Sequence, residues 1–399
     1  MNAASHRFGW YLAVLQLFFT LCWTVYAIYL PKLAATAGIA PTAVILILML
    51  DQAVFTVCDF ATGIAADRVT QALGRLGVYV TAATVLSCAA FLALPLIAPA
   101  GAAAFLTVTC VWTVTSSALR APPLMLLGKY AAKPATPYLA SLALLGTGIA
   151  GALAPYLAIA LRDQDPRWPF AVASLVLVLT TLGMISAERR LVKEAPRAKS
   201  APRAFARLDG RAAVFALAMI VLALGYQIHF ALESAPLYLR FAKPADLEWL
   251  MPVFWIGFNV TMFPAGWLTR KIGGYAVMGL AGLIGAIAAA AAQIAQSLDA
   301  LMAAQYIAGA GWGAILMSAF IVAFSIGENG GEGRLSGLLF STLAIATLAR
   351  MAAVATGMGA DPVFKAALQW LPAACWAIAG VVLLSLALAA LRRDAGGPA

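Results

Sequence analysis

Titratable side chains are rare inside the long apolar stretches of this sequence, and the few that occur there are candidates for chemistry. Asp51 and Arg350 each lie well inside an apolar stretch, and His229 and Glu233 share a third one. An ionised group is costly in such surroundings, so its presence suggests a function or a partner. We therefore treat Asp51 and Arg350 as candidate functional residues.

His229 and Glu233 are four residues apart, which places them on one face of a helix. Histidine titrates near neutral pH, so the two residues predict a site for proton or substrate handling, with a satisfied structural pair as the alternative. A metal site is the weakest interpretation, because His6 is the only other histidine. One imidazole and one carboxylate are too few ligands for zinc. We expect no metal and no cofactor.

The composition of the chain indicates the class of protein to which these residues belong. The chain has 399 residues, of which 63% are hydrophobic and 11% are charged. Soluble domains carry about 25% charged residues, so the sequence predicts an integral membrane protein. The net charge of +10 is best explained by basic loops on the cytoplasmic side of a bilayer, and we expect no nucleic-acid partner.

Twelve apolar stretches are long enough to cross a bilayer. Only helices satisfy their own backbone in lipid, so the expected fold class is an all-α integral membrane protein. A basic segment, 188–211, divides the stretches six and six, which predicts an N-terminal bundle over 1–187, a cytoplasmic linker and a C-terminal bundle over 212–399. The predicted spans are 10–30, 42–65, 76–98, 101–127, 138–160, 168–187, 212–239, 248–268, 275–296, 299–326, 336–359 and 366–391.

Successive loops between the predicted spans lie on opposite sides of the membrane. Most lysines and arginines are in one of these two sets of loops, the set that contains 188–211. Because basic loops stay in the cytoplasm, we expect a multi-pass protein of the inner (plasma) membrane with both termini cytoplasmic. We also expect it to be a monomer.

A short motif follows the second predicted span: Gly63, Asp67, Arg68, Gly74 and Arg75. It resembles the loop signature Gly-x-x-x-Asp-Arg-x-Gly-Arg of the major facilitator superfamily, with five residues instead of one between Arg68 and Gly74. A degenerate second copy, 266–274, follows the eighth span. The resemblance implies two pseudo-symmetric six-helix bundles, as expected of parallel repeats.

The resemblance also implies a central cavity lined by spans one, four, seven and ten, with spans two and eleven facing each other. Asp51 and Arg350 would then meet, either as a proton-sensitive pair or as a permanent structural pair. An unneutralised Arg120 in span four would favour an anionic ligand; alternatively, Arg120 extends to the membrane surface. The candidate substrate-binding residues are Arg120, Gln16, Trp23, Tyr26, Trp112, Ser116, Tyr226, Gln227, Asn259, Gln305, Tyr306 and Trp312.

In the resembled family, the acid of the loop signature meets the cytoplasmic start of span eleven, where a helix N-terminus favours negative charge. Here that start is Arg334-Leu335-Ser336, so Arg334 is expected to add a charge pair with Asp67. The contact would close the cytoplasmic side. We therefore group Asp67, Arg68 and Arg334 with Asp51, Arg350, His229 and Glu233 as proton-coupling or gating residues.

These features predict a secondary transporter that works by alternating access, with proton-coupled export of a small organic or amphipathic solute as the leading interpretation. Small residues at 141, 150, 154 and 158 in span five are weakly similar to a signature of the drug:proton antiporter group. Proton-linked uptake of a small organic anion is the alternative. A membrane enzyme or receptor scaffold is a third, but no catalytic or nucleotide-binding motif is visible, so we do not expect an enzyme.

Overall fold

The computed structural model describes residues 3–73, 76–131, 133–194, 210–328, 330–358 and 362–395, and every regular element among them is helical. The first half of the chain contains α1 (Ala3–Thr36), α2 (Val44–Leu73), α3 (Leu76–Ile97), α4 (Ala102–Ser116), α5 (Ala121–Tyr130), α6 (Thr136–Leu161) and α7 (Arg167–Glu194). The second half contains α8 (Gly210–Ile228), α9 (Ser234–Tyr238), α10 (Leu247–Leu250), α11 (Pro252–Ile272), α12 (Gly274–Ile294), α13 (Leu298–Ile326), α14 (Glu332–Ala355), α15 (Pro362–Leu368) and α16 (Leu371–Ala395).

Within the described residues, 11 helical segments are long and apolar enough to cross a membrane. The predicted eighth span is the one that falls outside this set, and it is the 21-residue helix α11. Its tryptophans, Asn259, Arg270 and Lys271 lower its hydropathy, yet it packs on α13 and α6 inside the bundle. The fold is therefore the all-helical, twelve-span arrangement that the sequence predicts.

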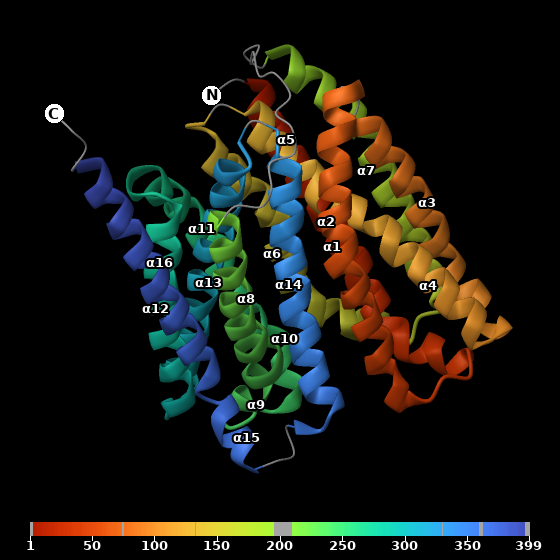
Figure 1. Cartoon of the computed structure of the whole chain (residues 1–399). Coiled ribbons are helices and arrows are strands. Elements are labelled where there is room, and N and C mark those ends of the chain that lie inside the picture. Colours follow the sequence, from red (N-terminus) through yellow and green to blue (C-terminus); the bar gives the residue numbers. More distant parts are fainter. Residues whose placement is uncertain are drawn as a thin grey trace.

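The helices pack mostly within their own half of the chain. In the first half α1 packs on α6 and α7, and α3 packs on α4 and α7; in the second, α13 packs on α11 and α12, and α8 packs on α14 and α16. Figure 1 shows the first half on the right, the second on the left, and both termini at one end of the bundle, here called the terminal end. The opposite end, near α9 and α15, is called the far end.

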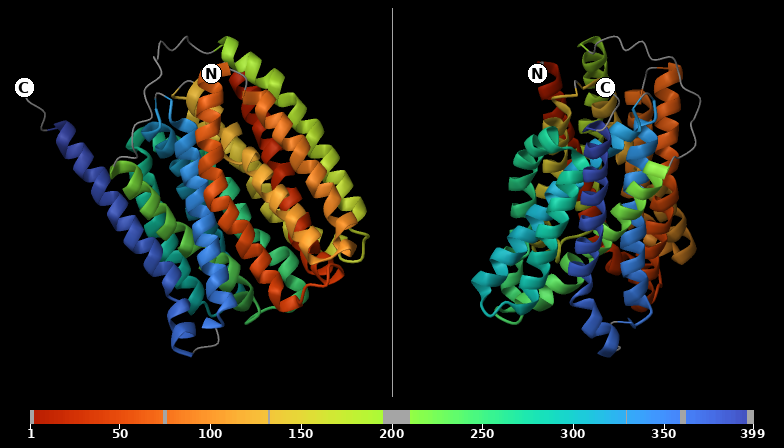
Figure 2. Two further views of the ribbon diagram at one scale, coloured as in Figure 1. Left: turned by 45° about the vertical axis from the view of Figure 1, so that its right-hand side comes forward. Right: turned by 60° about the vertical axis from the view of Figure 1, so that its left-hand side comes forward.

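The most extensive contacts between the halves are those of α2 with α14 and of α6 with α11; α5 also packs on α14. In both views of Figure 2, α14 lies alongside α2. Glycines allow this contact, because a Cβ on Gly63 would overlap the carbonyl of Gly333 and one on Gly337 would overlap the carbonyl of Asp59. Small residues let helix backbones approach closely, as membrane helices require.

Two spans depart from a regular α-helix. The fourth span is interrupted by the 3₁₀ turn Ser117–Leu119, and α5 then starts at Ala121 with Pro122 and Pro123. Proline has no N–H to donate and is best accommodated in the first turn of a helix, so these two consecutive prolines favour a break at Arg120. The seventh span contains a π-helical turn, η4 (His229–Glu233), between α8 and α9.

The predicted linker overlaps the end of α7, which continues to Glu194. Glu188 is buried on this helix and accepts hydrogen bonds from the N–H groups of Leu76 and Gly77, at 2.9 and 2.6 Å. The helix therefore extends beyond the predicted boundary at 187 because it caps α3. The rest of the linker, 195–209, and the motif residues Gly74 and Arg75 lie outside the described residues.

Replacing Gly337 with valine should destabilise the contact between α2 and α14. The new side chain meets backbone atoms of Asp59 and Phe60, which cannot move aside as a flexible side chain would. We expect a loss of about 1–3 kcal/mol, as for an overpacked core, measured as a lower Tm of the purified protein in detergent. Gly210→Ala is the control, because nothing lies within 4 Å of its Cβ position; equal Tm values for the two variants would contradict the role of Gly337.

Candidate functional site

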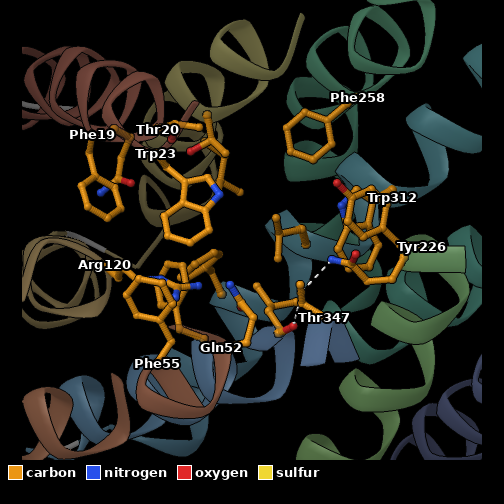
Figure 3. A pocket seen from close by; sticks show the side chains of 18 of the residues that line it. Phe19, Thr20, Trp23, Gln52, Phe55, Arg120, Tyr226, Phe258, Trp312 and Thr347 are labelled. Atoms are coloured by element: carbon orange, nitrogen blue, oxygen red, sulfur yellow. Dashed lines mark hydrogen bonds between the residues drawn. The ribbon is translucent and has the colours of Figure 1, made fainter. Parts of the chain in front are cut away.

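A cavity of about 390 Å³ lies between the two halves, a size typical of a small-molecule site. Helices of both halves contribute to its wall, and Figure 3 shows side chains from both sides directed toward its centre. It is lined by Gln16, Phe19, Thr20, Trp23, Gln52, Phe55, Arg120, Leu124, Leu144, Thr147, Tyr226, Gln227, Trp255, Phe258, Trp312, Leu316, Phe320, Phe340, Leu343, Thr347, Arg350 and Met351.

Arg350 is held in this wall by uncharged partners. Its Nε donates a hydrogen bond to Oε1 of Gln227 at 3.0 Å, and Nε2 of Gln227 donates to the hydroxyl of Thr347 at 2.8 Å. Thr347 donates in turn to the carbonyl of Leu343 at 2.8 Å. Among the described residues no carboxylate forms an ion pair with Arg350, so it contributes an uncompensated positive charge to the cavity.

Arg120, on the first half, differs because its charge is compensated. Its guanidinium forms an ion pair with Asp59 at 3.1 Å, and the Asp59 side chain is fully buried. The rings of Phe55 and Phe340 lie 4.4 and 5.1 Å from the guanidinium carbon, within the range of cation–π contacts. The prediction of an unneutralised Arg120 is therefore wrong, although Arg120 does line the cavity.

Aromatic rings form one stack in each half. In the first half, Trp23 stacks on Trp112 with ring centroids 5.6 Å apart; in the second, Tyr226 stacks on Trp312 at 4.5 Å and an interplanar angle of 2°. The spans that carry these rings are the first and fourth in one half and the seventh and tenth in the other, so the stacks occupy corresponding places. Trp23, Tyr226 and Trp312 line the cavity.

Asp51 does not meet Arg350, so the predicted pair is wrong for this conformation. The Asp51 carboxylate is buried and accepts hydrogen bonds from the hydroxyls of Tyr26 at 2.8 Å and Thr113 at 2.7 Å. These two donors satisfy both oxygens, while Gln227 holds Arg350. Tyr26 therefore donates a hydrogen bond to Asp51 and does not line the cavity, where it was predicted to lie.

The pair His229 and Glu233 is also absent, because the π turn changes the helical spacing on which it was predicted. His229 is buried and shares a hydrogen bond with Gln305 at 3.1 Å, and Ser234 donates to the same Gln305 oxygen at 3.1 Å. Glu233 accepts a long hydrogen bond of 3.4 Å from Gln293 instead. The cavity wall includes neither His229, Glu233 nor Gln305.

Several other predicted wall residues lie behind the wall. Trp112 is the rear ring of its stack, and Ser116 donates to the Thr113 carbonyl within α4. Asn259 faces Gly148 at the contact of α6 with α11, and Tyr306 does not reach the cavity. The predicted residues that do line it are Gln16, Trp23, Arg120, Tyr226, Gln227 and Trp312, together with Arg350, which was predicted for gating.

At the terminal end, Asp67 joins the halves as predicted. Its carboxylate accepts hydrogen bonds from the N–H groups of Gly333 and Arg334 at 2.8 Å each, in the first turn of α14. Negative charge is favourable at a helix N-terminus, so the contact is electrostatic as well as directional. Arg334 contributes its backbone N–H to this contact, and among the described residues its guanidinium does not form the predicted charge pair with Asp67. Arg68 is exposed on α2. Lys133 and Glu328 form a second link at 2.6 Å.

Sequence reasoning missed Asp59, Gln52 and Thr347. Asp59 lies in the same apolar stretch as Asp51, eight residues later, so the rule that singled out Asp51 applies to it equally. Thr347 precedes Arg350 by three residues, which places both on one helix face. Gln52 carries no such signal, because an uncharged polar residue in a span is common.

No protein-family model matches the sequence, and no curated protein aligns with it significantly. Solved structures match over nearly the whole chain. A bacterial homologue of the iron transporter ferroportin, in an outward-facing state, has a TM-score of 0.73 and 15% identity and covers 95% of this chain and 98% of its own. This chain has the major facilitator fold.

Two further major facilitator proteins illustrate the range of solutes on this fold. The human organic anion transporter MFSD10 (TETRAN) has a TM-score of 0.71 and 15% identity, covering 97% of this chain and 100% of its own. A variant of the Escherichia coli fucose:proton symporter FucP has a TM-score of 0.66 and 14% identity, covering 97% and 99%. The similarity to the drug:proton antiporter group stays a prediction. Of the four small residues on which it was based, Ser141 donates a hydrogen bond to the Met262 carbonyl where α6 meets α11.

Replacing Asp67 with alanine should open the terminal end of the protein, because the two charge-assisted hydrogen bonds between its halves are lost. We expect a cysteine introduced at Leu316, on a background without the native cysteines, to react several-fold faster with a maleimide applied from the terminal side. Glu188→Ala is the matched control, since it removes two similar bonds within one half. Equal labelling of the two variants would contradict the gating role of Asp67.

Proposed function

We propose that this protein is a secondary transporter that carries a small organic anion by alternating access. The observation that carries the proposal is the charge of Arg350: it faces a cavity shared by both halves, and its partner is an amide. A half-buried cation without a carboxylate partner is costly, and an anionic solute would relieve that cost. The largely apolar and aromatic remainder of the wall favours an organic anion over an inorganic one.

The neighbouring structures support transport but do not choose the solute. Their names include an organic anion transporter, a fucose:proton symporter and a homologue of an iron transporter, so one fold serves very different solutes. Among these, the organic anion is the class that an uncompensated guanidinium would bind.

The contact of Asp67 with α14 supports alternating access. It closes the terminal end, which the basic loops predict to be cytoplasmic, so the conformation described here would be closed toward the cytoplasm. Transport would require this contact to break while the far end closes.

A binding screen tests the anion proposal. Wild-type protein and Arg350→Gln would be heated in detergent with organic monoanions, neutral sugars and cationic amphiphiles. A ligand that binds only the folded state raises Tm, by about 2.7 kcal/mol of stabilisation at a hundredfold excess over Kd. We expect monoanions to raise the Tm of the wild type and not that of Arg350→Gln; stabilisation by sugars or cations alone would refute the proposal.

For proton coupling, we propose Asp59 rather than Asp51. Asp59 is the carboxylate paired with a cavity arginine, whereas Asp51 is satisfied by two hydroxyls behind the wall. Protonation of Asp59 would release the charge of Arg120 into the cavity and favour a bound anion. By linkage, a bound anion would favour the protonated carboxyl. Proton and anion would then move together, which favours uptake driven by an inward proton gradient over export.

Asp59→Asn should uncouple transport from protons. In proteoliposomes we expect it to exchange labelled anion across the membrane while losing accumulation driven by a pH gradient, because its side chain cannot release a proton. Asp51→Asn is the control and should keep gradient-driven accumulation, although it loses stability. Loss of coupling in Asp51→Asn alone would reverse the assignment, and outward accumulation in response to an inward proton gradient would establish export.

A further inference from the structure

The two aromatic stacks face each other across the cavity. Figure 3 places Trp23 on one side of the open centre and Trp312 with Tyr226 on the other. Trp23 is backed by Trp112, and Tyr226 is backed on its second face by Phe230, with ring centroids 5.9 Å apart. Rings fixed from behind cannot turn freely, so each half presents a rigid apolar surface to a solute between them.

The uncompensated cation lies next to the second stack. Gln227, the residue after Tyr226 on α8, accepts the hydrogen bond from Arg350 Nε, and Tyr226, Gln227 and Arg350 all line the cavity. The relay from Gln227 through Thr347 to the Leu343 carbonyl fixes the orientation of the amide. Because Nε is occupied, the terminal nitrogens of the guanidinium are left as the donors for a solute, in the fork that matches a carboxylate.

The geometry points to a planar aromatic monocarboxylate as the substrate class, held between Trp23 and the stack of Trp312 with Tyr226, with its carboxylate on Arg350. Gln227 is the positioning residue: it directs the guanidinium and, being uncharged, leaves the positive charge available. This inference rests on the proposed function and narrows it from organic anions to aromatic ones.

Three small probes separate the ring from the charge. Benzoate has both, cyclohexanecarboxylate keeps the charge on a non-planar ring, and benzamide keeps the ring without the charge. Titration calorimetry on the full-length protein in detergent should show benzoate binding about threefold to tenfold tighter than cyclohexanecarboxylate, the range expected of aromatic pairing. Benzoate should also bind more than about tenfold tighter than benzamide, as expected of a charge-assisted bidentate contact.

Variants assign these preferences to residues. Gln227→Glu places a carboxylate on Arg350 and should abolish the preference for benzoate over benzamide, while benzamide binding shows that the protein is folded. Thr347→Val should reduce the same preference a few-fold, and Thr347→Ser should restore it. Trp312→Leu should bring benzoate and cyclohexanecarboxylate to equal affinity. An unchanged preference in Gln227→Glu would overturn the positioning role.

The outcomes also separate this inference from the proposed function. Equal or weaker binding of benzoate compared with cyclohexanecarboxylate in the wild type would overturn the aromatic class while leaving an organic anion as the solute. Binding of benzamide alone would overturn both. Absence of binding by all three probes would overturn the aromatic class, and the Tm screen with other monoanions would then decide the proposed function separately.

Discussion

A charge removed from water and surrounded by apolar helices needs a compensating partner, and the arrangement of this bundle follows from how each buried charge obtains one. Arg120 has a carboxylate, Asp51 has two hydroxyls, and Asp67 has the N–H groups of a helix N-terminus. Arg350 differs in that it lines the cavity and has a single amide as its hydrogen-bond partner. Of these four groups, it is the one whose charge is available to a solute in the cavity.

The same constraint links the two halves at the terminal end. Asp67 on α2 caps α14, and Glu188 on α7 caps α3 in the same way within one half. A carboxylate on a helix N-terminus is a strong but short-range contact, since the dipole field falls off within the first turn. Such a contact can hold the terminal end closed and can still separate over a small displacement.

The architecture was largely predictable. Backbone groups in lipid must hydrogen-bond within their own segment, so each span is a long apolar helix that is easily recognised in the hydropathy of the sequence. The contact of Asp67 with α14 was predictable from a motif that places an acid beside a helix start. The partners of Asp51, Arg120 and Arg350 were not, because partner choice depends on helix rotation and on single rotamers. The π turn rotates His229 away from its expected neighbour, and the break at Pro122 and Pro123 sets the position of Arg120.

The π turn at His229–Glu233 also separates two surfaces of the seventh span. Before the turn, Tyr226 and Gln227 line the cavity; after it, Leu237 and Tyr238 join a distinct apolar cluster with Leu250 and Leu301 at the far end. A π turn holds one residue more than an α turn, which offsets the following segment by about 100° of helical phase. A shift of the wide turn along the helix would therefore re-orient only the residues that it passes, such as His229. Tyr226 can in this way keep its place in the cavity wall while Leu237 keeps its place in the far-end cluster.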